Sequence, residues 1–119
     1  MAVSADFHVF VVEQLEQVRA PVTAKRMFGG MGLYCGGLFF ALLADDTLYL
    51  KVDDVNRPDF EALGLTPFDP FQDGVRLMQY YPMPADVLED SEALAPWMEG
   101  ALAAAARARE KKGRGKKRS

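Results

Sequence analysis

The sequence has one cysteine, one histidine and one tryptophan among its 119 residues, and each scarcity excludes a class of protein. A single cysteine, Cys35, cannot form an internal disulfide and agrees with a reducing compartment. No apolar run approaches the roughly 20 residues that a membrane-spanning helix needs. The first residues also lack the basic start and apolar stretch of a signal peptide. We therefore expect a cytoplasmic protein that contacts no membrane.

Side chains suited to nucleophilic catalysis are equally scarce. The only histidine, His8, falls in the first predicted helix and is not near Cys35 in sequence. Without a base or a cationic neighbour to activate it, we expect the Cys35 thiol to be buried or inert. We predict no catalytic residue and hence no enzyme. The alternative is an enzyme of unknown type that uses Arg26, Lys51 and Cys35.

Cofactor and metal motifs are also missing. Gly29-Gly30-Met31-Gly32 lacks the Lys-Ser/Thr that completes a phosphate-binding loop, so a turn is the better interpretation. Acidic pairs occur at 45–46, 53–54 and 89–90. Each pair falls at a predicted turn or near a helix start, where short carboxylates hydrogen-bond to the nearby backbone. We predict no cofactor and no metal site.

Charge is distributed unevenly along the chain. Residues 1–106 hold 6 Lys/Arg and 16 Asp/Glu, a net charge of −10. Residues 107–119 hold 8 Lys/Arg and one Glu, a net charge of +7. An acidic body repels phosphate at long range, so attraction to a polyanion must come from the tail or from a local patch.

Apolar periodicity predicts helices at both ends of the chain. Ser4 is suited to cap a first helix, which ends before Pro21 and carries apolar residues at helical spacing. A short helix is predicted over 57–63, with Asn56 as its cap. The last helix begins near Ser91. Its apolar face consists of Leu94, Trp97, Met98, Ala101, Leu102 and Ala105.

Between these helices the sequence predicts a small antiparallel sheet. Glycine pairs and an Asp pair divide an apolar run into short segments, as in consecutive hairpins. The predicted strands are 23–28, 31–35, 38–44, 47–52 and 75–81, the last stopped by Pro82. The fold class is therefore α+β, a two-layer arrangement with about five strands and a meander as its centre.

Alternation along the strands separates two faces of this sheet. Leu48, Leu50 and Val52 point one way, toward the helices, whereas Tyr49 and Lys51 point the other way. Strand 38–44 is apolar on both faces, so something must cover the second face as well. A partner subunit is the economical explanation. The alternative is that the long C-terminal helix wraps over that side.

The order of these segments resembles a known family. Its most specific mark is Arg26-Met27-Phe28-Gly29-Gly30-Met31-Gly32-Leu33-Tyr34, followed by Leu48-Tyr49-Leu50-Lys51 and Asn56-Arg57-Pro58. Tyr80-Tyr81-Pro82-Met83-Pro84 and the late Trp97 complete the array. The chain resembles the N-terminal domain of the TfoX/Sxy family over about residues 5–106. We accordingly divide it into a TfoX N-terminal-like domain, 1–106, and a basic tail, 107–119, which we expect to fray.

The resemblance implies a role and a fold. Members of the family are implied to regulate natural competence in bacteria, acting with the cyclic-AMP receptor protein at particular promoters. That role fits the longer, two-domain members best, and this chain resembles the stand-alone ones. The implied fold is similar to that of secretion chaperones, a small antiparallel sheet with helices on one side, often paired as a homodimer.

One candidate contact surface lies on the predicted sheet. Arg26 and Lys51 are two of the six cations in the acidic body. They either form internal ion pairs or join Tyr34, Tyr49 and Tyr80 in a recognition surface, because aromatic residues and arginine anchor protein interfaces. The leading hypothesis is a non-enzymatic regulator or adaptor that acts through contacts with other proteins, such as a transcription regulator.

The basic tail supports a second hypothesis. Its cations either complement the negative end of the last helix or neutralise DNA phosphates. The tail has no aromatic residue to stack on bases, so it offers only nonspecific binding to nucleic acid. The candidate residues are Arg107, Arg109, Lys111, Lys112, Arg114, Lys116, Lys117 and Arg118.

Overall fold

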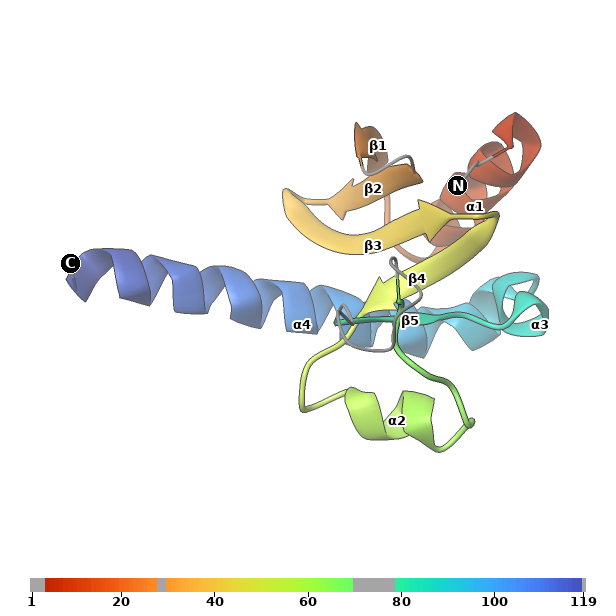
Figure 1. Cartoon of the computed structure of the whole chain (residues 1–119). Coiled ribbons are helices and arrows are strands. Elements are labelled where there is room, and N and C mark those ends of the chain that lie inside the picture. The colour runs from red at the N-terminus through yellow and green to blue at the C-terminus, as the bar shows by residue number, and fades with distance from the viewer. Residues whose placement is uncertain (1–3, 28–29, 70–78, 119) are drawn as a thin grey trace.

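The computed structural model describes residues 4–27, 30–69 and 79–118, with residues 112–118 as backbone. It shows a five-stranded antiparallel sheet with helices at both ends of the chain, which confirms the predicted α+β class (Figure 1). In chain order the elements are α1 (Ala5–Val18), β1 (Val22–Met27), β2 (Gly30–Cys35), β3 (Leu38–Ala44), β4 (Thr47–Lys51), α2 (Arg57–Glu61), β5 (Tyr80–Pro82), α3 (Ala85–Leu88) and α4 (Ser91–Arg118).

The strands follow one another across the sheet in the order β1-β2-β3-β4-β5, and each neighbouring pair is antiparallel. Gly36 and Gly37 join β2 to β3 with φ angles of 58° and 79°. Asp45 and Asp46 join β3 to β4 with φ angles of 50° and 51°. Paired left-handed residues match the twist of tight hairpins, and aspartate tolerates this conformation better than most residues. The predicted meander is therefore present.

Most element boundaries differ from the prediction by one or two residues, and the largest differences lie after α2. Residues 75–78 of the predicted fifth strand lie outside the described residues, and β5 includes Pro82, which pairs with Tyr49. Pro82 is tolerated because β5 is an edge strand. At an edge, the missing N–H of proline costs no hydrogen bond between strands. The short α3 was not predicted. It precedes α4, where Asp90 Oδ1 accepts a hydrogen bond of 3.0 Å from the backbone nitrogen of Glu92.

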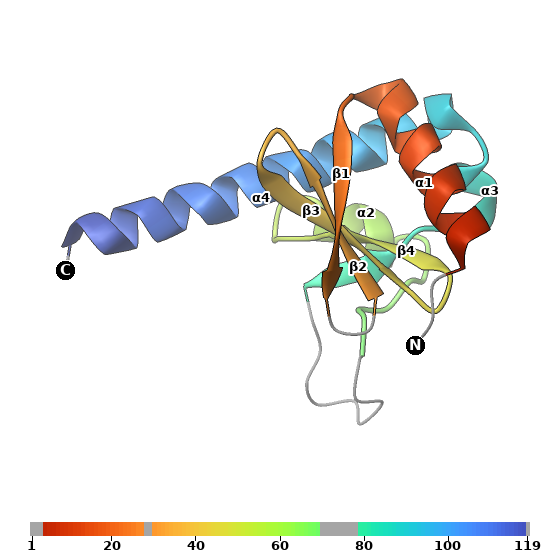
Figure 2. The ribbon, with the colours of Figure 1, turned by 90° about the horizontal axis from the view of Figure 1, so that it is seen from above.

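One face of the sheet packs against the helices and forms the core (Figure 2). Val11 and Leu15 of α1 and Leu94 and Met98 of α4 are all 0% exposed. They meet the inward side of β4, so the predicted direction of its apolar residues is confirmed. Each fully buried aliphatic side chain contributes about 1.5–3 kcal/mol through removal of its apolar surface from water.

A register shift between β2 and β3 places one extra aromatic residue in this core. Leu33 pairs with Ala41 and Tyr34 pairs with Phe39, so Phe40 has no partner on β2. Its side chain is 0% exposed and belongs to the core cluster. Phe39, on the other side of the bulge, is left on the opposite face of the sheet.

The second face of the sheet is not covered by α4. Leu42 and Tyr80 are buried but stand outside the core cluster that the helices share. The alternative in which the C-terminal helix wraps over this face is therefore wrong, because the apolar side of α4 is fully used against the first face. Part of the cover comes from Phe68, whose backbone nitrogen donates a 2.7 Å hydrogen bond to the Tyr80 carbonyl.

The basic segment continues the last helix. α4 runs without interruption from Ser91 to Arg118 and projects beyond the sheet (Figures 1 and 2). The expected fraying of residues 107–119 is a property of the chain in solution, namely the fraction of molecules in which this part is helical. It therefore stays a prediction.

Gly30 provides a test of the sheet geometry. A Cβ added there would lie 2.1 Å from the carbonyl oxygen of Leu43, which is backbone and cannot move aside cheaply. We expect Gly30→Ala to lower the free energy of unfolding by about 1–3 kcal/mol or more. Gly100→Ala is the matched control, since its Cβ would meet Asn56 at an ordinary 3.7 Å and alanine favours helix by about 1 kcal/mol. Equal stability of the two variants in urea unfolding would contradict the register of β2 and β3.

Candidate functional site

Aromatic side chains gather on the second face of the sheet. Tyr34 stacks on Phe39 with ring centroids 5.0 Å apart, and Phe39 lies 5.8 Å from Tyr80. Lys51 places its Nζ 5.2 Å from the centre of the Tyr80 ring, a cation–π geometry. We call this surface the aromatic face and define it as Tyr34, Phe39, Tyr49, Lys51, Phe68 and Tyr80.

The strand register explains this cluster. Tyr34 lies opposite Phe39, and Lys51 lies opposite Tyr80, so each pair points to the same side. Tyr49 forms a separate pair with Phe68, at 4.4 Å between ring centroids. Tyr34, Phe39 and Tyr49 are half-buried, which leaves part of each ring accessible.

Four of the five predicted surface residues lie on the aromatic face, and one lies elsewhere. Arg26 pairs with Met31, which packs against the core, so alternation places Arg26 at the rim of the helix-covered side. Lys25, which pairs with Gly32, is on the same side of the sheet as the aromatic face but lies exposed on the edge strand, outside the ring cluster. Sequence reasoning missed Phe39 and Phe68. The apolar residues on both faces of β3 were a signal for Phe39. Phe68 lies in a loop, where no strand pattern indicates which surface a side chain joins.

Burial changes the acidity of the phenols on the aromatic face. Desolvation, with a smaller contribution from Tyr34, raises the pKa of Tyr80 to about 12. Desolvation and the nearby Asp45 also raise the pKa of Tyr49. Both side chains therefore stay protonated at neutral pH. Tyr49, which is half-buried, can offer apolar ring surface and a hydrogen bond to a partner, whereas the buried Tyr80 supports the rings around it.

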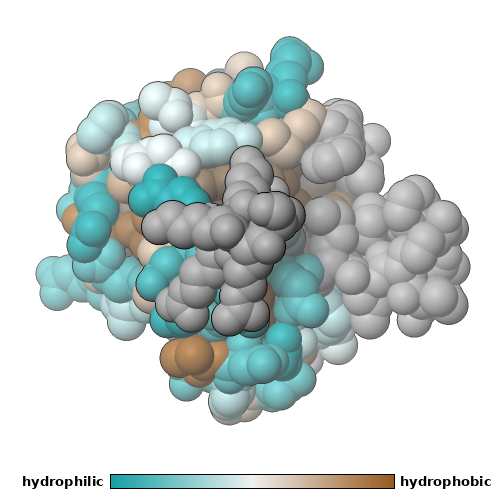
Figure 3. Space-filling view, turned by 90° about the vertical axis from the view of Figure 1, so that its left-hand side faces the viewer, coloured by the Kyte–Doolittle hydropathy of each residue, from teal (hydrophilic) through white to brown (hydrophobic). Residues whose placement is uncertain are grey.

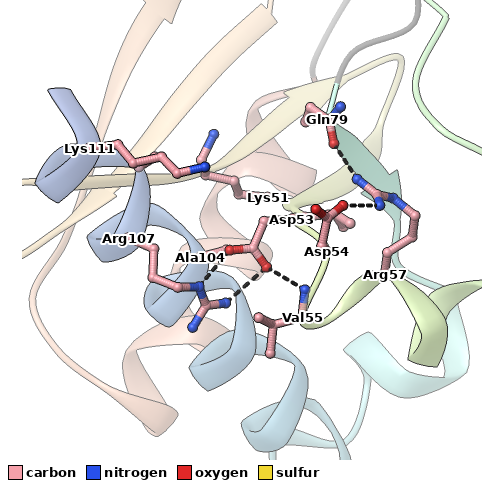
Figure 4. Close-up of a pocket in the computed structure, with 11 residues that line it drawn as sticks. Lys51, Asp53, Asp54, Val55, Arg57, Gln79, Ala104, Arg107 and Lys111 are labelled. Atoms are coloured by element: carbon pink, nitrogen blue, oxygen red, sulfur yellow. Dashed lines mark hydrogen bonds and ion pairs between the residues drawn. The ribbon is translucent and has the colours of Figure 1, made fainter. Parts of the chain in front are cut away.

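A second candidate site lies beside α4. In the view along this helix, hydrophilic side chains surround the place where it leaves the body (Figure 3). A cleft of about 430 Å³ opens there, between α4 and the segment that joins β4 to α2 (Figure 4). Its lining is Lys51, Val52, Asp53, Asp54, Val55, Arg57, Gln79, Ala104, Arg107, Ala108 and Lys111.

Asn56 holds the β4–α2 segment in place. Its Oδ1 accepts a 2.8 Å hydrogen bond from the Asp53 nitrogen, and its Nδ2 donates one of 3.0 Å to the Lys51 carbonyl. Asn56 is the N-cap residue of α2, as predicted, but its side chain makes no capping hydrogen bond, because this amide is buried and bonds backward along the chain instead. The arrangement turns Asp53 toward α4.

Both carboxylates of the cleft pair with arginines. Arg107 donates to Asp53 through Nε at 2.6 Å and through Nη2 at 2.9 Å, a bidentate contact. This hydrogen bonding by Arg107, with further donation from the Val55 nitrogen, lowers the pKa of Asp53 and outweighs its partial burial. Arg57 pairs with Asp54 and donates a 2.9 Å hydrogen bond to Gln79. These pairs set the orientation of both arginines at the cleft wall.

The remaining candidate side chains stay apart. Cys35 is buried, as expected, and its Sγ lies 3.9 Å from the Arg19 carbonyl oxygen. His8 is on α1. In the described part of the chain, no three His, Cys, Asp or Glu side chains converge as metal ligands. None of the helices described is long and apolar enough to span a membrane.

Comparison with protein families gives a match over most of the chain. The family model of the TfoX N-terminal domain matches residues 13–105. This range contains the whole aromatic face and ends before Arg107. No curated protein matches the sequence.

The Asp53–Arg107 pair has a testable pH dependence. Because its folded pKa is lowered, ionised Asp53 stabilises the fold above its unfolded pKa, and this contribution disappears as pH falls through the folded value. We expect Arg107→Gln to be less stable than the wild type at about pH 7, with a smaller difference at about pH 3. Arg109→Gln removes a charge from an exposed side of the same helix and is the control. A deficit for Arg107→Gln that is equal at both pH values in urea unfolding would contradict the pairing.

Proposed function

The chain belongs to the TfoX N-terminal domain family, and from that premise we propose that it is a non-catalytic regulatory domain that acts through protein contacts. The TfoX resemblance implies regulation of natural competence, in concert with the cyclic-AMP receptor protein at its promoters. Such a role places the protein in the bacterial cytoplasm. The observation that carries the proposal is the aromatic face.

The composition of this face favours protein recognition. Tyrosines, phenylalanines and a lysine lie together on one face of the sheet, and aromatic side chains supply much of the binding energy in protein interfaces. The stacked rings are held by one another and by the strands. They therefore lose little conformational freedom on binding, which reduces the cost of association.

We propose a second copy of the chain as the first occupant of the aromatic face. The edges of the sheet are poor dimerisation sites. β1 carries exposed Lys25 and Arg26, which would bring like charges close together if two β1 strands paired at these residues, and β5 is short and contains Pro82. Both features discourage edge pairing. The half-buried rings are the apolar surface that pairing of two copies would cover.

A promoter assay tests the regulatory role. In a competent bacterium that lacks its own TfoX-type protein, we expect the wild-type chain to raise expression from a promoter controlled by the cyclic-AMP receptor protein. Phe39→Asp places a charge at the centre of the aromatic face and should abolish the increase, since loss of a central contact costs about 2 kcal/mol or more. Lys25→Gln, near the rim, is the control and should retain most of it.

Two results of this assay would count against the proposal. No increase with the wild-type chain, at a verified protein level, would contradict the regulatory role. A full increase with Phe39→Asp, shown by circular dichroism to be folded, would contradict the involvement of the aromatic face. Tyr34→Asp serves as a second variant if Phe39→Asp proves unstable.

A further inference from the structure

We propose that the cleft beside α4 binds the phosphate backbone of duplex DNA, and that the basic side of α4 extends this contact. The inference rests on the cleft and not on the stacked rings, although Lys51 belongs to both surfaces. Its starting point is charge. Lys51, Arg57, Arg107 and Lys111 line the cleft with only two carboxylates, within a body whose net charge is −10.

The carboxylates of the cleft position its cations. Asp53 and Asp54 orient the guanidinium groups of Arg107 and Arg57 through hydrogen bonds. The printed contacts of Arg107 use Nε and Nη2, and among the described residues its Nη1 has no protein partner. An arginine already fixed in this way can donate to a phosphate oxygen with little further loss of side-chain freedom.

Lysines converge on the same cleft from two elements. Lys51 comes from β4, and Lys111 reaches from α4 in the direction of Lys51 (Figure 4). Both side chains end in an ammonium group, so an anion in the cleft can be attracted to the two of them together. A phosphate diester, with its single negative charge and two exposed oxygens, suits such a position.

The course of α4 argues for a polymer rather than a small anion. Residues 107, 111, 114 and 118 are basic and follow at spacings of four, three and four, on one side of a helix that continues to Arg118. At about 1.5 Å per residue, this side extends for roughly 16 Å from the cleft. A mononucleotide would fill the cleft alone, whereas a DNA strand presents phosphates along the whole track.

The predicted contact is independent of base sequence. Among the described residues that line the cleft, none has an aromatic side chain on which a base could stack. Contacts of lysine and arginine to phosphate fix position and supply affinity but do not read bases. We therefore expect the cleft to increase affinity for DNA at any promoter, with selection of the site supplied by a partner.

Fluorescence anisotropy of a labelled duplex of arbitrary sequence tests this inference on the full chain. We expect binding that weakens with salt, with log affinity falling by about 0.9 per phosphate contact for each tenfold rise in salt. Lys51→Gln and Lys111→Gln should each weaken binding and reduce the salt slope by about one contact. Lys25→Gln, at the opposite edge of the sheet, and Arg109→Gln, off the basic side of α4, are matched controls.

Several outcomes would overturn the proposal. The first is that the wild-type chain does not bind the duplex. The second is that the controls and the cleft variants lose the same amount of affinity. The third is that Lys51→Gln binds like the wild type, because the binding would then belong to the tail alone. Competition by inorganic phosphate or a mononucleotide at concentrations far below those needed for simple screening would show a small-anion site instead. Phe39→Asp should bind DNA like the wild type, which separates this inference from the protein-contact role.

Discussion

The structure depends on the packing of α4 across one face of the sheet. Leu94 and Met98 of this helix lose all solvent contact against β4 and α1, and Ala101 allows the helix backbone to come close. Every other helix contributes to the same cluster, including Phe60 of α2, which lies 4.8 Å from Trp97. The described helices all pack on this face, so none of them covers the other one.

Both candidate sites follow from that asymmetry. The uncovered face carries the stacked rings, partly closed within the described residues by Phe68. The cleft arises where α4 passes the margin of the sheet and the β4–α2 segment turns toward it, fixed by Asn56 and by the Asp53–Arg107 pair. Lys51 belongs to both sites, because its backbone lies in β4 and its ammonium group lies over Tyr80 while it also lines the cleft.

The features predictable from the sequence were those with local causes. Hairpin turns, strand alternation in β4 and the apolar side of α4 are each encoded within a few neighbouring residues. Other features depend on how the strands pair. The register of β1 with β2 decides on which side of the sheet Arg26 lies. A bulge between β2 and β3 turns Phe40 into the core, and no residue type in the sequence indicates this bulge. The cleft joins residues 51–57 to residues 104–111, which no motif links.

The central claim is that a second copy of the chain covers the aromatic face. Light scattering behind a sizing column tests it most directly, with the wild-type chain and Phe39→Asp compared at the same micromolar concentration. The account predicts twice the chain mass for the wild type and the single-chain mass for the variant. A single-chain mass for the wild type, or a dimer that is unaffected by Phe39→Asp, would contradict it.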